Sequence, residues 1–282
     1  MEKIAVLLTC FNRKSKTRNC LQSLLSILPD ANVFLVDDAS TDGTVEMIKS
    51  EFPMINLIRG DGNLFWSRGM YLAWSHAIKG DYDYYLWLND DVLLYPYFYQ
   101  ELKECMSLND DYAIISGLIE DMHTHKTIYG GTNDFGVLIA ADGKMHCIHD
   151  MNGNVVLISR AVIQKIGIID PVYHHGGADT DYGYTARKHG IPVLSTRCHV
   201  AAGYENNFCR IRKWNTSIIK RFKVLYSPMG LEPNIGFYMM KKHFGICKAI
   251  FYWTYIHILN ILPDRIITFI WGDKYIDKSR EY

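Results

Sequence analysis

The 282-residue sequence lacks the features that mark several protein classes. Its seven cysteines include no Cys-x-x-Cys pair, so neither a disulfide framework nor a zinc site is predicted and a reducing compartment is expected. Lysine plus arginine and aspartate plus glutamate number 30 each, so the formal net charge of zero indicates no nucleic-acid partner. The N-terminal apolar run is too short for a signal-peptide core and is typical of a first strand. We therefore expect a cytoplasmic protein.

Uninterrupted runs of about twenty apolar residues, the length that spans a membrane, are also missing. Residues 244–271 are apolar and aromatic but are broken by Lys248, Pro263, Asp264 and Arg265. Helices packed on the domain are one interpretation. A peripheral contact with the inner face of the membrane is another, because a basic, aromatic stretch precedes this segment. A homodimer contact is the third. The basic stretch contains Arg210, Arg212, Lys213, Lys220, Arg221 and Lys223.

What the sequence does contain is a repeated alternation of short apolar runs, polar loops and helical segments. Strands are predicted over residues 4–8, 32–36, 55–58 and 84–88, and helices over 15–28, 44–51, 97–107 and a segment ending at 77. The alternation predicts an α/β fold with a Rossmann-like, mostly parallel sheet flanked by helices. Further strands are predicted over residues 112–117 and 151–160, with an irregular or antiparallel section between them, and the second of these strands is entered through an Asn-Gly turn. A short helix is predicted over residues 161–166.

Each of the first four predicted strands ends in a polar loop. These loops cover residues 9–13, 37–42, 61–68 and 89–91. Because parallel strands share a direction, we expect the loops to meet along one edge as a single cleft. Asn89, Asp90 and Asp91 end the last apolar run. Such a pair of acids either opens a turn or provides hard oxygen ligands for Mg²⁺ or Mn²⁺.

A second acidic group begins a later predicted helix. Asp179 and Asp181 lie at its start, and Arg187 and Lys188 lie near its end. This distribution complements the helix dipole, so capping is one interpretation. A positioned catalytic base is the other, and the two are compatible.

Five segments in order carry a family resemblance. They read TCFNR, VDDASTDGT, LNDDV, NGNVVLISR and HHGGADTDYGYTARKHG. This set resembles the family 2 glycosyltransferases of the GT-A fold over about residues 4–207. The NGN and GGADTDY stretches, with a trailing SPMGLEP, are most similar to the rhamnosyltransferase-like branch of bacterial surface-polysaccharide enzymes.

The resemblance implies a division of the chain into two domains. A GT-A domain would cover residues 1–207, with a nucleotide-binding region over residues 1–117 and an acceptor-binding and catalytic region over residues 118–207. A helical C-terminal extension would cover residues 208–282.

The resemblance also implies roles for individual residues. Asp179 would be the catalytic base, Asp91 the ligand of Mg²⁺ or Mn²⁺, and His199 a further metal ligand. The positions expected to bind the nucleotide-sugar are Thr9, Asn12, Arg13, Asp38, Asp61, Asn63 and Asp90, with Asp38 accepting a pyrimidine N–H. Side-chain chemistry, rather than the resemblance, suggests the acceptor or sugar side, because rings stack on sugar faces and histidine donates hydrogen bonds. The residues expected there are Trp66, Tyr173, His174 and His175, together with Asn152 and with Asp181, which could share the work of the base.

The implied activity is inverting transfer of a hexosyl or deoxyhexosyl group from a UDP or dTDP donor. The acceptor would be a hydroxyl of a saccharide or lipid-linked saccharide in polysaccharide biosynthesis. Asn89 replaces the first acid of the family's Asp-X-Asp signature, and Ala178 an acid that often precedes the base. Both favour the alternative, an inactive GT-A-fold carbohydrate-binding or scaffold protein. A nucleotidyltransferase is disfavoured because the first loop, TCFNRKSK, has no glycine.

Overall fold

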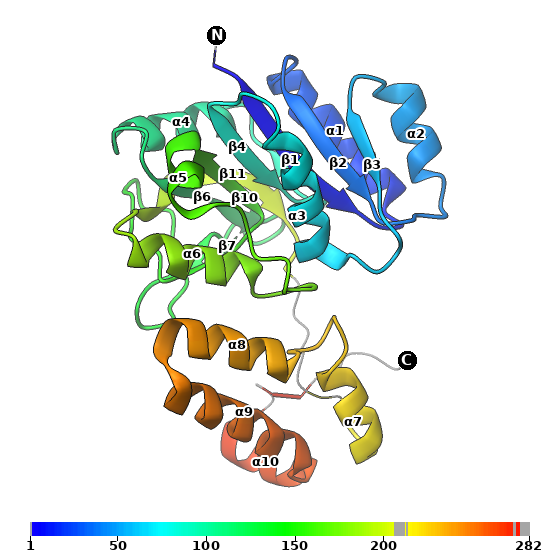
Figure 1. The fold of residues 1–282 in the computed structure, drawn as a ribbon, viewed down its shortest axis with the longest axis vertical. Coiled ribbons are helices and arrows are strands. Elements are labelled where there is room, and N and C mark those ends of the chain that lie inside the picture. Colours follow the sequence, from blue (N-terminus) through cyan, green and yellow to red (C-terminus); the bar gives the residue numbers. More distant parts are fainter. Residues whose placement is uncertain (1, 206–211, 213, 273–274, 277–282) are drawn as a thin grey trace. The chain divides into compact units, whose positions relative to one another are not determined.

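The computed structural model describes residues 2–205, 212, 214–272, 275 and 276 (Figure 1). The chain divides into two compact units. The first unit comprises Met1–Pro171 and Ala178–Glu205, and the second comprises Val172–Gly177 and Asn206–Tyr282. The predicted boundary at residue 207, and Arg210 and Lys213 of the basic stretch, lie outside the described residues.

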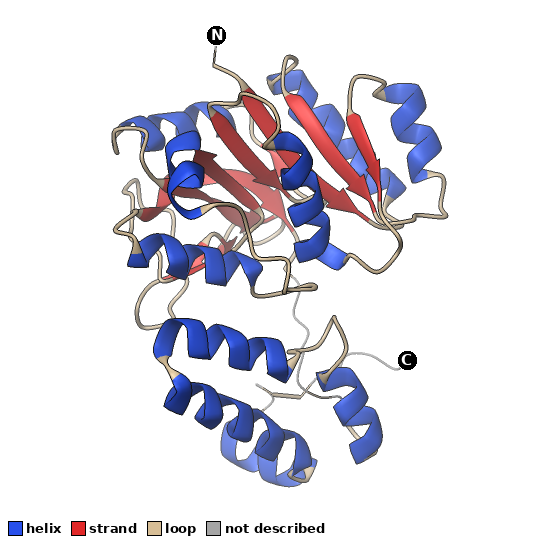
Figure 2. Ribbon diagram, viewed as in Figure 1, coloured by secondary structure: helices blue, strands red, loops and turns tan. Residues whose placement is uncertain are grey.

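The first unit is built on a nine-stranded sheet (Figure 2). Its order is β3-β2-β1-β4-β10-β6-β11-β5, and β7 pairs with β6. The strands are β1 (Ile4–Cys10), β2 (Asn32–Asp37), β3 (Asn56–Arg59), β4 (Tyr84–Leu88), β5 (Leu93–Leu94), β6 (Ile114–Asp121), β7 (Thr127–Tyr129), β10 (Val155–Ser159) and β11 (Val193–Gly203). A separate two-stranded sheet contains β8 (Gly131–Thr132) and β9 (Asp150–Met151).

Helices flank this sheet as the alternation predicted (Figure 2). They are α1 (Lys14–Ile27), α2 (Thr44–Glu51), α3 (Phe65–Ala77), α4 (Phe98–Ser107), α5 (Arg160–Ile166) and α6 (Ala178–Lys188). The α/β class is therefore confirmed. Strands β1 to β4 are mutually parallel along the order β3-β2-β1-β4, and β6 is parallel to β11. The neighbours of β10, and the pairs formed by β5 and β7, are antiparallel.

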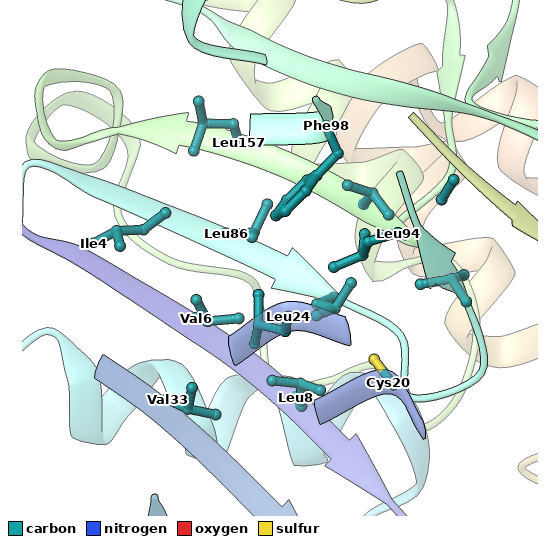
Figure 3. Close-up of a cluster of buried hydrophobic side chains, with 14 of the residues drawn as sticks. Ile4, Val6, Leu8, Cys20, Leu24, Val33, Leu86, Leu94, Phe98 and Leu157 are labelled. Atoms are coloured by element: carbon teal, nitrogen blue, oxygen red, sulfur yellow. The ribbon is translucent and has the colours of Figure 1, made fainter. Parts of the chain in front are cut away.

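The main hydrophobic core lies against the sheet and is formed by strands and helices together (Figure 3). All five residues of β4 are buried, as expected for a strand covered on both faces. Helix α1 buries Thr17, Cys20, Leu21 and Leu24, which recur with the helical period, and Cys20 and Leu24 point into the cluster. Phe98 of α4 closes the same cluster beside Leu86 and Leu157.

The prediction of one strand over residues 151–160 is wrong in its extent. Strand β9 ends at Met151 and β10 begins at Val155, so residues 152–154 form the turn between them. Because β10 is antiparallel to β4, with Val155 opposite Leu88, the start of β10 lies at the edge where β4 ends. This reversal brings the Asn-Gly-Asn turn to the predicted cleft.

The second unit is helical. It contains α7 (Ile218–Leu225), α8 (Pro233–Phe244), α9 (Ile246–Ile261) and α10 (Asp264–Trp271). A small core joins them, centred on Leu225, Ile256, Leu259 and Ile267. The fully buried Arg212 guanidinium donates to the carbonyl oxygens of Leu259 and Leu262, both at 2.7 Å, and to Asp264. None of the helices in the described part of the chain has the length and apolarity needed to cross a membrane.

Candidate active site at the carboxyl edge of the sheet

The loops after β1 and β2 are joined through Asn12. Its backbone N–H donates to Ser40 Oγ at 2.9 Å, and its side-chain oxygen accepts from the Thr41 N–H at 2.8 Å. Asn12 has φ of +51°, a left-handed conformation that asparagine tolerates better than most residues. Thr9 of β1 faces position 69 of α3. Any Cβ at position 69 would collide with the Thr9 hydroxyl, so Gly69 lets α3 approach β1.

The loops after β2 and β3 are joined through Asp38. This buried carboxylate accepts three backbone N–H bonds, from Gly62 at 2.8 Å, Leu64 at 2.9 Å and Phe65 at 3.1 Å. The resemblance implies a pyrimidine N–H as the partner of Asp38, and in the structure this carboxylate holds the third loop. Asp61 and Asn63 lie exposed in that loop, where the Asn63 N–H donates to Asp61 Oδ1 at 2.9 Å.

The acid pair after β4 contacts the loop after β1. Arg13 donates to Asp90 Oδ1 at 3.1 Å and to Asp91 Oδ2 at 2.9 Å. Thr17, one turn further along α1, donates its hydroxyl to Asp90 Oδ2 at 2.9 Å. Burial raises the pKa of Asp90 to about 6; Arg13 opposes this shift and the neighbouring Asp91 charge adds to it. Sequence reasoning missed Thr17, although its i+4 spacing from Arg13 places it on the same helix face.

The two acids differ in access to solvent. The Asp90 side chain is 5% exposed and that of Asp91 is 21% exposed. Within the described residues, no group of three or more His, Cys, Asp or Glu side chains is arranged to hold a metal ion. A single accessible carboxylate still fits Mg²⁺ or Mn²⁺, because Mg²⁺ commonly binds through one or two carboxylates together with substrate phosphates. Asp91 is the residue that meets this requirement.

The ring contacts of His199 do not include Asp91. The ring contacts Glu120 Oε2 at 3.1 Å through Nδ1 and Thr127 Oγ1 at 2.8 Å through Nε2. Burial lowers the pKa of His199, and Glu120 opposes the shift.

Asn89 connects β4 to the turn before β10. Its backbone N–H donates to the Asn154 carbonyl at 2.8 Å, and its side-chain nitrogen donates to Asn154 Oδ1. Trp66 Nε1 donates to Asn89 Oδ1 at 2.8 Å. Because an indole N–H can only donate, the oxygen of the Asn89 amide must face Trp66 and its nitrogen must face Asn154. Asn89 thus occupies the signature position as a bridge between these two residues.

Asp179 lies on the other side of the same turn. Its carboxylate accepts the Gly153 N–H at 3.0 Å through Oδ2 and the Thr180 N–H at 2.9 Å through Oδ1, in the first turn of α6. A Cβ at position 153 would lie 2.5 Å from Trp66 Cη2 and 3.3 Å from Asp179 Cβ. Trp66, Gly153 and Asp179 are therefore immediate neighbours. The continuous chain of contacts runs from the acid signature through Asn89, Asn154 and Gly153 to Asp179.

A match to a family model agrees with this arrangement. The model described as glycosyl transferase family 2 matches residues 5–167, more than half of the chain. The chain belongs to glycosyl transferase family 2. The resemblance inferred from the motifs is thus confirmed at the level of the family. A search of curated proteins found no match.

Solved structures support the GT-A fold of this family 2 domain. The crystal structure of S. aureus TarS 1-349 is 14% identical with a TM-score of 0.54, and the alignment covers 95% of this chain and 74% of the TarS 1-349 chain. GalNAc-T7, solved with UDP, GalNAc and Mn²⁺, is 15% identical with a TM-score of 0.57 over 93% of this chain. The aligned region spans 58% of the GalNAc-T7 chain. At these identities the likeness establishes the fold.

The residues predicted for the acceptor side lie in both units of the structure. The Asn152 carbonyl accepts from Ser116 Oγ at 3.4 Å, and Asp181 is buried in α6. His175 belongs to Val172–Gly177, which clusters with the second unit. In that segment Tyr173 is buried, and His174 Nδ1 lies 2.6 Å from Glu232 Oε1. Trp66 is a predicted acceptor residue that the structure places next to Asp179, on either side of position 153.

Helix α6, which carries Asp179, is held by aromatic packing that the sequence did not indicate. Tyr182 of α6 packs against Trp74 at 5.4 Å and Trp87 at 5.5 Å between ring centroids. Its hydroxyl donates to the Gly167 carbonyl at 2.9 Å. Trp87 lies in β4, two residues before Asn89, so the same strand anchors the start of α6 and carries the acid signature.

Proposed function

We propose that this chain is an inverting, metal-assisted glycosyltransferase that uses a nucleoside-diphosphate sugar. The observation that carries the proposal is the continuous bridge at the carboxyl edge, which links the acid pair after β4 to Asp179 through Asn89, Asn154 and Gly153. A glycosyltransferase requires a group that holds the diphosphate and a base for the acceptor hydroxyl at a fixed separation. The bridge supplies that separation with backbone and amide hydrogen bonds.

The donor side of the site comprises the loops after β1, β2 and β3. UDP and dTDP are the proposed nucleotides, and the GalNAc-T7 structure contains UDP. The donor-binding residues are Thr9, Asn12, Arg13, Asp38, Asp61, Asn63 and Asp90. Because Asp38 already accepts three N–H bonds, its main contribution is to hold the loop that carries Asp61 and Asn63 in place. The motif likeness to rhamnosyltransferases makes a deoxyhexosyl donor the first to test.

Asp91 is the residue proposed to hold Mg²⁺ or Mn²⁺, with diphosphate oxygens completing its ligands. When bound, the cation offsets negative charge on the departing nucleoside diphosphate. Arg13 contributes positive charge at the same place, since it already contacts both carboxylates. His199 is not part of this proposal, because its ring contacts Glu120 and Thr127.

Asp179 is proposed to accept the proton of the acceptor hydroxyl as that oxygen attacks the sugar C1. Attack from the face opposite the nucleotide inverts the anomeric configuration. The two N–H bonds from Gly153 and Thr180 orient its carboxylate, and Trp66 provides an aromatic surface beside it. Asn152, His175 and Asp181 stay proposals for the acceptor side. A saccharide, carried on a lipid in polysaccharide biosynthesis, is the proposed acceptor.

The alternative of an inactive fold depended on Asn89 and Ala178. The structure gives Asn89 a bridging role that an intact catalytic site can use, and Ala178 is a buried position of α6. Both positions are therefore compatible with the proposed activity. A dead fold would bind sugar without nucleotide, which calorimetric titration with UDP and free sugars would reveal.

The deciding experiment is a thermal-shift panel of UDP, dTDP, GDP and CMP, each with Mn²⁺, Mg²⁺ or EDTA. A ligand at a hundred times its dissociation constant stabilises the folded state by about 2.7 kcal/mol. We expect a metal-dependent shift with UDP or dTDP that is lost in Asp91→Ala. If no nucleotide shifts the midpoint under any metal condition, the donor assignment is wrong.

A further inference from the structure

One face of α9 presents large apolar side chains to solvent. Positions 247, 251, 254, 258 and 261 recur at intervals of four, three, four and three residues, so they share one helix face. They are Cys247, Phe251, Thr254, Ile258 and Ile261, all exposed and all uncharged. Phe251 is 72% exposed. An exposed apolar face of this kind marks an interaction surface.

Helix α10 continues the pattern. Its exposed residues include Ile266, Phe269 and Ile270, and Phe269 is 91% exposed. The small core of the unit is made by other residues of the same helices, among them Ile256, Leu259 and Ile267. Both helices are therefore apolar on two sides, although only one side packs inward. We call the outward set, Phe251, Ile258, Ile261, Ile266, Phe269 and Ile270, the α9–α10 face.

The charge of the second unit indicates the charge of the partner that would contact the α9–α10 face. Its described residues contain two acids, Glu232 and Asp264. Glu232 pairs with His174, and Asp264 pairs with Arg212 and Arg221. The exposed cations are Lys220, Lys223, Lys241, Lys242, Lys248 and Arg265. Because both acids contact basic side chains of the same unit and six cations are exposed, the described surface of this unit is strongly positive.

We propose that the α9–α10 face inserts into the interfacial region of an anionic lipid surface. Apolar and aromatic side chains flanked by cations are the combination that binds such a surface. Sixteen residues make α9 about 24 Å long, shorter than the roughly 30 Å hydrocarbon core, so the helix lies in the interface. A second copy of the chain is a poorer occupant, since a two-fold contact would bring the same cations together. The proposal rests on the proposed function, because it explains how a lipid-linked acceptor is reached.

Vesicle co-sedimentation of the full chain tests this. Phosphatidylcholine vesicles are compared with vesicles that also contain phosphatidylglycerol, at low and high salt. The variant is Phe251→Gln combined with Phe269→Gln, both at exposed positions. Phe135→Gln is the matched control, because Phe135 is 90% exposed in the first unit. We expect wild type to prefer anionic vesicles, with the double variant binding about tenfold more weakly or worse and Phe135→Gln binding as wild type.

Three results would overturn the proposal. They are wild-type binding that is indifferent to phosphatidylglycerol, a double variant that binds as wild type, and a wild-type dimer in light scattering that the double variant dissociates. The last result would make the face a subunit interface. The nucleotide thermal-shift panel, run on the same proteins, separates this proposal from the donor assignment: failure of UDP and dTDP to stabilise wild type removes the enzyme function and leaves the vesicle result standing.

Discussion

Two regions of the carboxyl edge use acids for different purposes. In the loops after β2 and β3, Asp37 and Asp38 are buried; Asp37 pairs with Arg59 at 3.1 Å and Asp38 accepts three backbone N–H bonds. At the β4–α6 side, Asp91 and Asp179 are partly exposed and their oxygens face the cleft loops and the Asn-Gly-Asn turn. Acids of the first kind are buried and hold backbone in place, and acids of the second kind keep part of their surface exposed to solvent. Removing them should therefore affect stability and turnover, respectively.

The largest expected effect is on turnover at Asp179. Asp179→Asn removes the base but keeps an oxygen that accepts a backbone N–H, so general-base assistance worth about 10²- to 10⁴-fold in kcat is lost. The folded state should keep its unfolding midpoint and its affinity for the donor nucleotide. Steady-state kinetics measure turnover. Thermal unfolding with and without the donor nucleotide measures the midpoint and shows whether the nucleotide still binds. Turnover within a factor of two of wild type would disprove the assignment.

A change at Asp38 should lower the stability of the fold, in contrast to the change at Asp179, which lowers turnover. Asp38→Ala leaves three backbone N–H groups without their acceptor, and we expect the free energy of unfolding to fall by about 3 kcal/mol. Asp61→Ala, in the exposed section of the same loop, is the matched control and should change it by less than about 1 kcal/mol. Urea denaturation gives both values. Equal losses would mean that the Asp38 hydrogen bonds do not stabilise the loop.

Gly153→Ala tests the point where the two sides of the edge meet. The new Cβ would lie 2.5 Å from Trp66 Cη2, so the indole must move away from Asn89 and Asp179. A displacement of about 1 Å can cost 10²-fold in rate, and we expect kcat to fall by that order with nucleotide binding retained. Gly183→Ala in α6 is the control, because its Cβ meets only Met151 Cβ at an ordinary 3.5 Å. Similar kinetics for the two variants would argue against a positioning role of the turn.

A pair remote from the edge provides a stability effect that depends on pH. Burial raises the pKa of Glu101, but hydrogen bonds from Arg197, the shortest at 2.6 Å, lower it more, so the net shift is downward. The pair therefore stabilises the fold above the usual glutamate pKa, and this contribution is lost as pH falls through the lowered value. Glu101→Gln should cost about 1 kcal/mol at pH 7 and much less near pH 3.

Denaturation at several pH values measures this contribution. Glu104→Gln is the control, because Glu104 contacts the same guanidinium from a more exposed position and should cost less. A Glu101→Gln deficit that stays constant from pH 7 to pH 3 would contradict the ionic origin. Neither change should alter kcat, since the pair lies on α4 and β11.

The smallest effect is expected from restoring an acid at the signature position. If Asn89 stands in for a lost metal ligand, Asn89→Asp should tighten metal binding. The structure predicts less than about a twofold change in the Mn²⁺ concentration that gives half-maximal activity, because this side chain faces Trp66 and Asn154. Manganese titrations of both proteins decide between the two interpretations.

The sequence predicted the elements better than the contacts. The strand over residues 84–88 and the helix over 44–51 have their predicted bounds, because apolar periodicity and turn residues are local signals. The Asn-Gly pair predicted a turn before β10, but the antiparallel direction of β10 left no local signal. The three donors to Asp38 come from more than twenty residues further along the chain, a partnership that no local pattern encodes.

The reversed direction of β10 has a consequence for how such a site can diversify. Every donor-side loop comes from residues before 92, whereas the turn and helix α6 come from residues after 150. Recombination between these segments would exchange one set of loops for another. The exchanged halves would have to match where they meet, at the hydrogen bonds between Asn89 and Asn154 and at position 153, where a Cβ would lie 2.5 Å from Trp66 Cη2 and 3.3 Å from Asp179 Cβ. Glycine at position 153 is therefore one requirement for halves of different ancestry to stay compatible.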